Sequence, residues 1–199
     1  MIDAIRKRKL RQASCKLLRD AILVALAAIL SVVCAPAQQR PTESQVKAAY
    51  LYNFGKFVTW QADQPATDSL VICVLGKDPF GAVLDATVAG ENINGKPITV
   101  TRLARLQDAA PCRILFISSS EQKRLRPILA AVQRLGMLTV SDIPSFAQQG
   151  GIIEFVNQED KIRFEVNLDA AAEAHLVLSS QLLKVASKVI DNDTPQPQP

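Results

Sequence analysis

The sequence predicts an α/β domain of three layers, in which helices flank a mostly parallel sheet. We also expect a C-terminal antiparallel hairpin and a long C-terminal helix. Short apolar runs at residues 69–75, 113–117 and 137–140 have the composition of strands that are buried on both faces. Helical patterns separate these runs, and alternating strands and helices favour a parallel sheet that is covered on both sides.

Residues 1–37 have the organisation of a secretory signal peptide. A basic head over residues 1–20 precedes an apolar run over residues 21–33, and Ala35-Pro36-Ala37 fits a small-x-small cleavage site. We expect cleavage after Ala37 rather than a permanent anchor, because a membrane-spanning helix needs about 20 apolar residues. Lipidation at Cys34 is disfavoured, since the branched Val33 precedes it. The mature protein is therefore expected in the bacterial periplasm.

Removal of that segment changes the net charge of the protein. Residues 1–37 hold 7 of the 23 basic and 2 of the 19 acidic residues, so the charge falls from +4 to −1. No basic patch remains that would favour nucleic acid as a partner. We expect one α/β domain over residues 38–190, which is long enough for a hydrophobic core. The tail at 191–199 is rich in proline and glutamine and is expected to be disordered.

Capping residues and turn residues place the remaining elements. The first helix is expected over residues 43–60, with Thr42 or Ser44 as its N-cap. Asp78 and Pro79 fit the start of a second helix, and Gly136 ends a third helix that begins at Glu121. The other predicted elements are a half-exposed strand at 98–103, a short helix at 144–149, a hairpin of strands at 152–156 and 161–166, and one long helix from Asn167 or Asp169 to residue 190.

The residues that usually carry catalysis are scarce. His175 is the single histidine, and its expected place on the apolar side of the last helix favours a core or boundary role. Two cysteines and one histidine after cleavage are too few for an ordinary structural zinc site. The glycines at 76–81 are spaced like those of a phosphate loop, but Gly-Lys-Ser/Thr does not follow. We therefore expect a protein that is not an enzyme and that uses no metal or cofactor.

Cys73 and Cys112 are the two cysteines that remain after cleavage. In an exported protein two cysteines favour one disulfide. Neighbouring parallel strands can bring their Cα atoms within the ~4.4–6.8 Å that the bond requires. Two roles stay open for such a bond. A structural staple is favoured over a redox-sensitive bond that tunes binding.

Aromatic residues are concentrated in the first helix. Tyr50, Tyr52, Phe54, Phe57 and Trp60 lie within eleven positions, and they make up half of the aromatic residues after cleavage. Three of them can share one helical face, whereas Tyr52 lies about 200° round from Tyr50 and points elsewhere. They form either a wide buried face, which is favoured, or a buried set beside an exposed patch that binds a partner.

Polar residues follow the predicted parallel strands at their carboxyl ends, where α/β sheets bind ligands. These candidates for binding a small anion or polar ligand are Gly76, Asp78, Ser118, Ser119, Ser120 and Asp142. A ligand would use their hydroxyl groups and the helix N-termini beside them. The favoured alternative is that these residues only cap helices.

Five segments in order resemble the YfiR family of periplasmic proteins. They are SQVKAAYLYNFGKFVTW at 44–60, LVICVLG at 70–76 with Pro79-Phe80, GGIIEF at 150–155, IRFEVN at 162–167, and SSQLL at 179–183. The resemblance covers about residues 43–190. It implies a non-enzymatic negative regulator that binds the periplasmic domain of an inner-membrane signalling protein. In the family such a target is a diguanylate cyclase, whose repression lowers cyclic di-GMP and thereby controls biofilm formation.

The resemblance also carries expectations about cysteines and assembly. It implies a disulfide at Cys73 and Cys112, a response to redox conditions, and a possible homodimer. A second family disulfide is not expected here, because residues 146–151 contain no cysteine. Fold-level likeness does not fix function, so cyclase repression is expected by analogy. A small-molecule binding module is the alternative.

Overall fold

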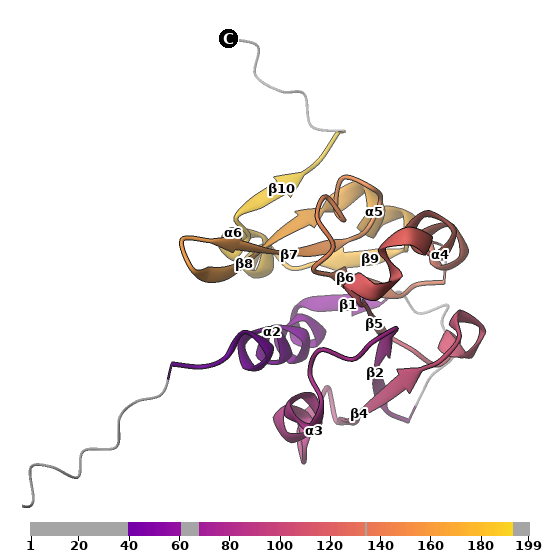
Figure 1. Ribbon diagram of the computed structural model, residues 1–199, viewed down its shortest axis with the longest axis vertical. Helices are drawn as coiled ribbons and strands as arrows, with labels where there is room; N and C mark the ends of the chain where they lie inside the picture. Colours follow the sequence, from indigo (N-terminus) through magenta and orange to yellow (C-terminus); the bar gives the residue numbers. More distant parts are fainter. Residues whose placement is uncertain (1–39, 61–67, 134, 193–199) are drawn as a thin grey trace, which may run out of the picture. The chain divides into compact units, whose positions relative to one another are not determined.

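The computed structural model describes residues 40–60, 68–133 and 135–192 (Figure 1). The expected signal peptide at 1–37 lies outside the described residues, and so do residues 193–199 of the tail expected at 191–199. Within the described residues, none of the helices combines the length and the apolar character that crossing a membrane requires.

A mixed sheet of eight strands forms the centre of the domain, in the order β10-β8-β7-β6-β5-β2-β4-β3. Its parallel part consists of β4 (Lys96–Leu103), β2 (Leu70–Leu75), β5 (Ile114–Ile117), β6 (Leu138–Ser141) and β7 (Ile153–Gln158). The remaining strands are β8 (Lys161–Asn167), which forms an antiparallel hairpin with β7, β10 (Lys188–Ile190), which runs parallel to β8, and β3 (Asn92–Ile93), which is antiparallel to β4. The predicted mostly parallel sheet and the hairpin are confirmed.

The sheet has a hydrophobic cluster on each face, because successive strand residues point to opposite sides. On β2, Leu70, Ile72 and Val74 belong to one cluster, and Val71, Cys73 and Leu75 belong to the other. All six residues are buried, as predicted for a strand in the middle layer. Helices therefore cover both faces, and the three-layer arrangement is confirmed.

Different helices serve the two faces. The first cluster holds residues of α2 (Glu43–Phe57), α3 (Ala82–Val88), α5 (Leu168–Glu173) and α6 (Ser180–Val185). The second holds residues of the 3-10 helix η1 (Leu106–Ala109) and of α4 (Leu125–Val132), which directly follows the 3-10 helix η2 (Ser119–Arg124). In Figure 1, α2 and α4 lie on either side of the strands that form the parallel part.

The first helix is shorter than predicted. It ends at Phe57, and residues 58–60 form strand β1 (Val58–Trp60), which pairs antiparallel with β9 (Leu176–Leu178) in a separate two-stranded sheet. Val58 and Thr59 are β-branched and Trp60 is aromatic, so these residue types favour a strand. The sequence analysis extended the helix to residue 60, because the apolar residues before this point are spaced as in a helix.

The predicted long C-terminal helix is wrong. The chain instead forms α5, β9, α6 and β10 in succession. His175 has a φ of 55°, a left-handed conformation that ends α5 one residue after its cap. The next three residues alternate buried, exposed and buried as a strand does, and the Ser179 side chain then caps α6 by accepting a hydrogen bond from the Leu182 amide. The predicted short helix at 144–149 is a series of turns.

Candidate functional site

The aromatic segment of α2 is mainly a buried contact with the sheet. A capping box at Thr42 starts the helix, since its side chain accepts from the Gln45 amide and Gln45 accepts from the Thr42 amide. Phe54 is 1% exposed, and its ring centroid lies 5.8 Å from that of Phe155 and 5.1 Å from that of Phe164. Phe54 therefore belongs to the core and is removed from the expected partner-binding set.

The other four aromatic residues of that set are half-buried and pack against the first cluster. Tyr50 contacts Phe54 and Phe164, with centroid distances of 5.8 and 5.4 Å. The Tyr52 hydroxyl donates to Glu91, and the Lys56 ammonium lies 3.8 Å from the centre of the Tyr52 ring. The favoured expectation of a wide buried face describes most of this segment, and the half-buried rings keep an exposed rim.

Lys47 is a buried cation on the same helix, which the sequence analysis did not single out. Its Nζ lies 2.7 Å from Asp142 Oδ2, and it also pairs with Glu43. Burial by itself would lower the pKa of Lys47, but the hydrogen bonds to Asp142 and Glu43, together with their charges, hold that pKa above its usual value. A lysine four residues after a glutamate at a helix start is a weak sequence signal for this pair.

Asp142 therefore has a different role from the other candidate ligand-binding residues. It is the partner of Lys47, and its Oδ1 is buried without a hydrogen-bond partner among the described residues. The carboxyl end of β6 is thus joined to α2 rather than to the loops that follow β2 and β5.

The loops that follow β2 and β5 are in direct contact. The Lys77 amide donates to Ser120 Oγ at 2.9 Å. A Cβ at Gly76 would lie 2.5 Å from that oxygen and 2.9 Å from Glu121, so only glycine fits there. Ser118 accepts from the Ser120 amide and caps η2, while Ser119 is exposed. The hydroxyl groups of Ser118 and Ser120 are therefore engaged with neighbouring protein atoms.

Asp78 takes part in an ion-pair network with strand β4. It accepts hydrogen bonds from the Phe80 amide at 2.7 Å and from Arg102 Nε at 3.0 Å. Arg102 also pairs with Asp85 and donates to the Gly81 carbonyl at 2.7 Å. The hydrogen bond to Asp85 raises the pKa of Arg102, and the same bond lowers the pKa of Asp85. The network joins α3 to β4, so Asp78 has a structural role.

The disulfide joins Cys73 to Cys112 with a Cα–Cα distance of 5.8 Å. Cys73 lies within β2, and Cys112 lies in the turn before β5 rather than in the strand itself. Their exposed fractions are 0% and 3%, and both belong to the second cluster. A bond that is buried in this way is shielded from reductants, which supports the structural staple more than the switch.

Hydrogen bonds fasten the loop at 142–151, which carries no cysteine. The Glu154 carboxylate is buried and accepts from the Ser145 amide at 2.8 Å and the Ala147 amide at 3.0 Å. Asn167 donates to the Ala147 carbonyl at 2.7 Å. Sequence reasoning missed Glu154, although an acidic residue inside the apolar run at 152–156 was a visible signal of a buried partner.

His175 is exposed in the turn between α5 and β9, which corrects the expected place on an apolar helix face. Among the residues that the structure describes, no three His, Cys, Asp or Glu side chains lie close enough to hold a metal ion.

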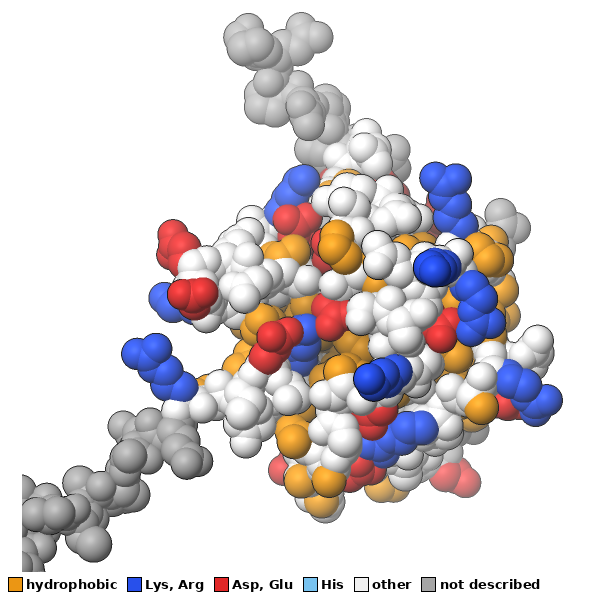
Figure 2. All heavy atoms as spheres, viewed as in Figure 1, with side chains coloured by type: hydrophobic (Ala, Val, Ile, Leu, Met, Phe, Trp, Pro, Cys, Tyr) orange, Lys and Arg blue, Asp and Glu red, His pale blue; other side chains and the backbone are white. Residues whose placement is uncertain are grey.

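On the face drawn in Figure 2, basic and acidic side chains are interspersed.

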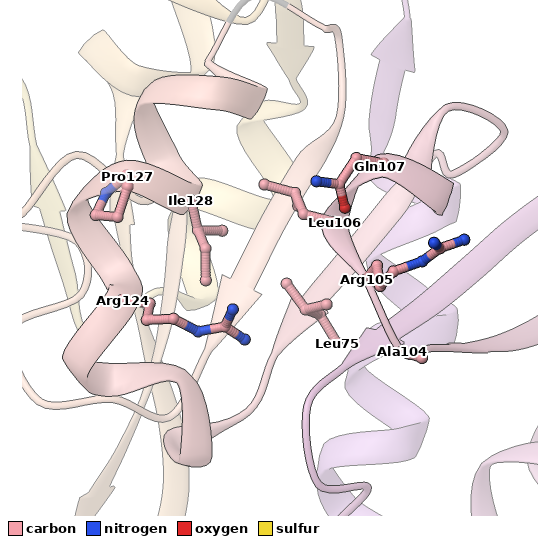
Figure 3. Close-up of a pocket in the computed structure, with 8 residues that line it drawn as sticks. All are labelled: Leu75, Ala104, Arg105, Leu106, Gln107, Arg124, Pro127 and Ile128. Carbon is pink, nitrogen blue, oxygen red and sulfur yellow. The ribbon is translucent and has the colours of Figure 1, made fainter.

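A groove of about 460 Å³ opens at the carboxyl end of β2, on the face of the sheet that holds the disulfide (Figure 3). Leu75, the last residue of β2, lies between its two walls. One wall is the segment at 104–107, and the other is formed by Arg124, Pro127 and Ile128. The sequence analysis did not predict the groove, because its walls come from segments that meet only in the folded chain. Leu106 and Gln107 belong to η1, Arg124 ends η2, and Pro127 and Ile128 belong to α4.

The comparisons with known proteins decide the family. A family model described as DUF4154, YfiR/HmsC-like, matches residues 44–187. The chain belongs to the YfiR/HmsC-like family. Membership confirms the resemblance seen in the sequence. The comparison with curated proteins found no match to this chain.

Two solved structures are similar to this YfiR/HmsC-like chain. A conserved domain protein from Vibrio cholerae has a TM-score of 0.50 at 10% identity, covering 74% of this chain and 60% of that one. An ABC domain in complex with L-Trp from Streptococcus pneumoniae has a TM-score of 0.49 at 10% identity, covering 72% and 60%. The chain thus spans 60% of the length of each. At such identity the Vibrio cholerae structure supports the α/β fold alone.

Proposed function

We propose that this protein is a periplasmic, non-enzymatic regulator that binds and represses a membrane signalling protein, with a diguanylate cyclase as the expected target. The observation that carries the proposal is the family match over residues 44–187, which reaches from the first turn of α2 to beyond α6. The signal-peptide pattern at 1–37 supports export to the compartment where the sensor domain of such a target lies.

We propose that strands β1 and β9 provide the contact surface for this partner. In an antiparallel pair, directly opposite residues point to the same side. Val58 and Leu178 are opposite each other and buried, whereas Thr59 and Val177 are opposite each other and exposed. Val177 is 55% exposed and is one of the few large hydrophobic residues on the described surface.

Neighbouring features support that choice. β1 and β9 pair only with each other within the described residues, so each has an edge with no third strand. A free edge can accept a strand from a partner. We propose further contacts through the exposed rims of four aromatic residues of the α2–β1 segment, which are Tyr50, Tyr52, Phe57 and Trp60. Aromatic residues contribute strongly to protein interfaces.

Site-specific photocrosslinking tests this surface in the exported full-length protein. A photoreactive amino acid replaces Val177 in one strain and Val189 in another, and mass spectrometry identifies the products. Val189 on β10 is a matched control, because it is also an exposed strand valine. We expect a crosslink from position 177, and not from 189, to an inner-membrane protein with a periplasmic domain. The absence of a membrane-protein product from position 177 would contradict the proposed surface.

A second copy of the chain is a further proposed partner. Val185 on α6 is 60% exposed and Val189 on β10 is 38% exposed, and β10 is the last strand of the main sheet. A homodimer through this edge predicts a concentration-dependent mass in analytical ultracentrifugation that Val189→Asp shifts to the monomer. A monomer at all concentrations would rule the dimer out.

A further inference from the structure

The groove at the end of β2 combines an apolar interior with a directed cation. Figure 3 shows Leu106 reaching across the gap toward Ile128, while the Arg124 guanidinium points toward Leu75. Arg105 also belongs to the lining, but Figure 3 shows its guanidinium directed away, and it pairs with Asp108. One guanidinium is therefore positioned to meet a ligand in the groove.

Glu121 holds that guanidinium in place. Its carboxylate is buried beside Gly76 and accepts a hydrogen bond from Arg124. A guanidinium has five N–H donors in a fixed fork, so Arg124 can keep Glu121 and still bind a second carboxylate. Because Arg124 is oriented before any ligand arrives, binding loses less side-chain entropy.

The place of the groove in the fold agrees with a binding site. In parallel α/β sheets, ligands bind beyond the carboxyl ends of the strands. Between β2 and β5 this position is filled, because Ser120 and Glu121 lie against Gly76. The groove opens beside it, and its volume of about 460 Å³ is within the range that small-molecule sites occupy.

We propose that this groove binds a small molecule that has an apolar body and a single carboxylate. The carboxylate would pair with Arg124, and the body would lie among Leu75, Leu106 and Ile128. The lining holds no acidic residue, so an ammonium group on the ligand would find no partner there. Free amino acids are therefore disfavoured. The groove lies on the opposite face of the sheet from α2, so the proposal does not depend on the partner surface.

A nuclear magnetic resonance titration of the mature protein, purified from the periplasm, tests the proposal. The probe is 3-phenylpropionate, added up to about 10 mM at neutral pH. We expect saturable shifts of the Leu106, Gln107 and Ile128 amide signals. The neutral 3-phenylpropionamide and the zwitterion L-phenylalanine are each expected to bind about tenfold more weakly or worse, because each lacks one feature that the groove selects.

Variants assign the effect to the groove. Arg124→Gln should weaken binding of 3-phenylpropionate about tenfold, whereas Arg126→Gln should leave it unchanged. Arg126 is the matched control, because it is an exposed arginine at the start of α4, two residues from Arg124 and outside the lining. Ala104→Glu is a second test that retains the pair of Arg124 and Glu121. Ala104 is exposed in the lining, and a carboxylate there should compete with the probe and abolish its binding.

The proposal is overturned by any of three results. They are the lack of saturable shifts at these amides, equal binding of the amide analogue, and equal loss of binding in the Arg124→Gln and Arg126→Gln variants. Stronger binding of phenyl phosphate than of 3-phenylpropionate would also overturn it, since it would assign the groove to phosphate esters. None of these results bears on the crosslinking at Val177, so the two proposals fail separately.

Discussion

Lys47 Nζ lies 2.7 Å from Asp142 Oδ2, and this ion pair joins two residues that are 95 positions apart in the sequence. The Lys47 side chain is 7% exposed and the Asp142 side chain 22% exposed. The pair links α2 to the carboxyl end of β6. It therefore fixes against the sheet the helix that carries four of the five clustered aromatic residues.

Lys47→Met should lower the free energy of unfolding by about 3 kcal/mol, because it leaves a largely buried carboxylate without its cation. Urea denaturation of the mature protein measures this change. Lys56→Met is the matched control on the same helix, since Lys56 is exposed and contacts the Tyr52 ring; we expect a loss below about 1 kcal/mol. Equal losses of unfolding free energy in the two variants would show that the ion pair does not stabilise the fold.

The same pair predicts a dependence of stability on alkaline pH. The pKa of Lys47 is raised in the folded state above its ordinary 10.5. A raised lysine pKa stabilises the fold below the unfolded pKa, and this contribution is lost as the pH rises through the folded pKa. The difference in unfolding free energy between the wild type and Lys47→Met should therefore be constant near neutral pH and shrink above about pH 10.5. A difference that stays the same at high pH would argue against the pair.

Loss of the disulfide should destabilise the protein without changing its fold. The bond closes a separation of 39 residues, for which chain entropy contributes about 4 kcal/mol. The double variant Cys73→Ala/Cys112→Ala is expected to lose about that amount in urea denaturation, and the wild type should lose the same on reduction. A staple also predicts that crosslinking from Val177 persists after mild reduction. Crosslinking that stops on reduction, in protein that remains folded, would instead establish a redox switch.

Gly151 is required by a close approach of the backbone to the Phe146 ring. A Cβ at this position would lie 2.0 Å from a ring carbon of Phe146, which is fully buried. Gly151→Ala should therefore cost about 3 kcal/mol through overpacking. Gly150→Ala separates sterics from backbone strain, because Gly150 has a φ of 99° and open space around it; its cost should be about 1 kcal/mol. A milder effect at 151 than at 150 would refute the close contact.

The elements predicted correctly are those in which local composition and tertiary environment agree. The run at 70–75 is apolar at every position, and burial on both faces of a parallel sheet is the environment that accommodates such a run. The hairpin at 153–167 has a turn in which Glu159 and Asp160 adopt positive φ, and polar residues mark it in the sequence.

The errors arise where two patterns share the same residues. Residues 168–190 have apolar positions that fit a helix, but the left-handed His175 and the cap at Ser179 divide them into four elements. The candidate ligand-binding residues were placed correctly at strand ends. The ion-pair partners of Asp78 and Asp142 are Arg102 and Lys47, which lie 24 and 95 positions away in the sequence, so local patterns did not reveal these roles. The groove depends on 3-10 turns that have no strong sequence signal.

The level of cyclic di-GMP inside cells of the native host tests the central claim most directly. Deletion of the gene should raise that level several-fold, and the full-length chain should restore it. A chain that lacks residues 2–37 should not restore it, because it remains in the cytoplasm. Val177→Asp should fail as well. A level that is unchanged on deletion, or that is restored by the unexported chain, would contradict a periplasmic repressor.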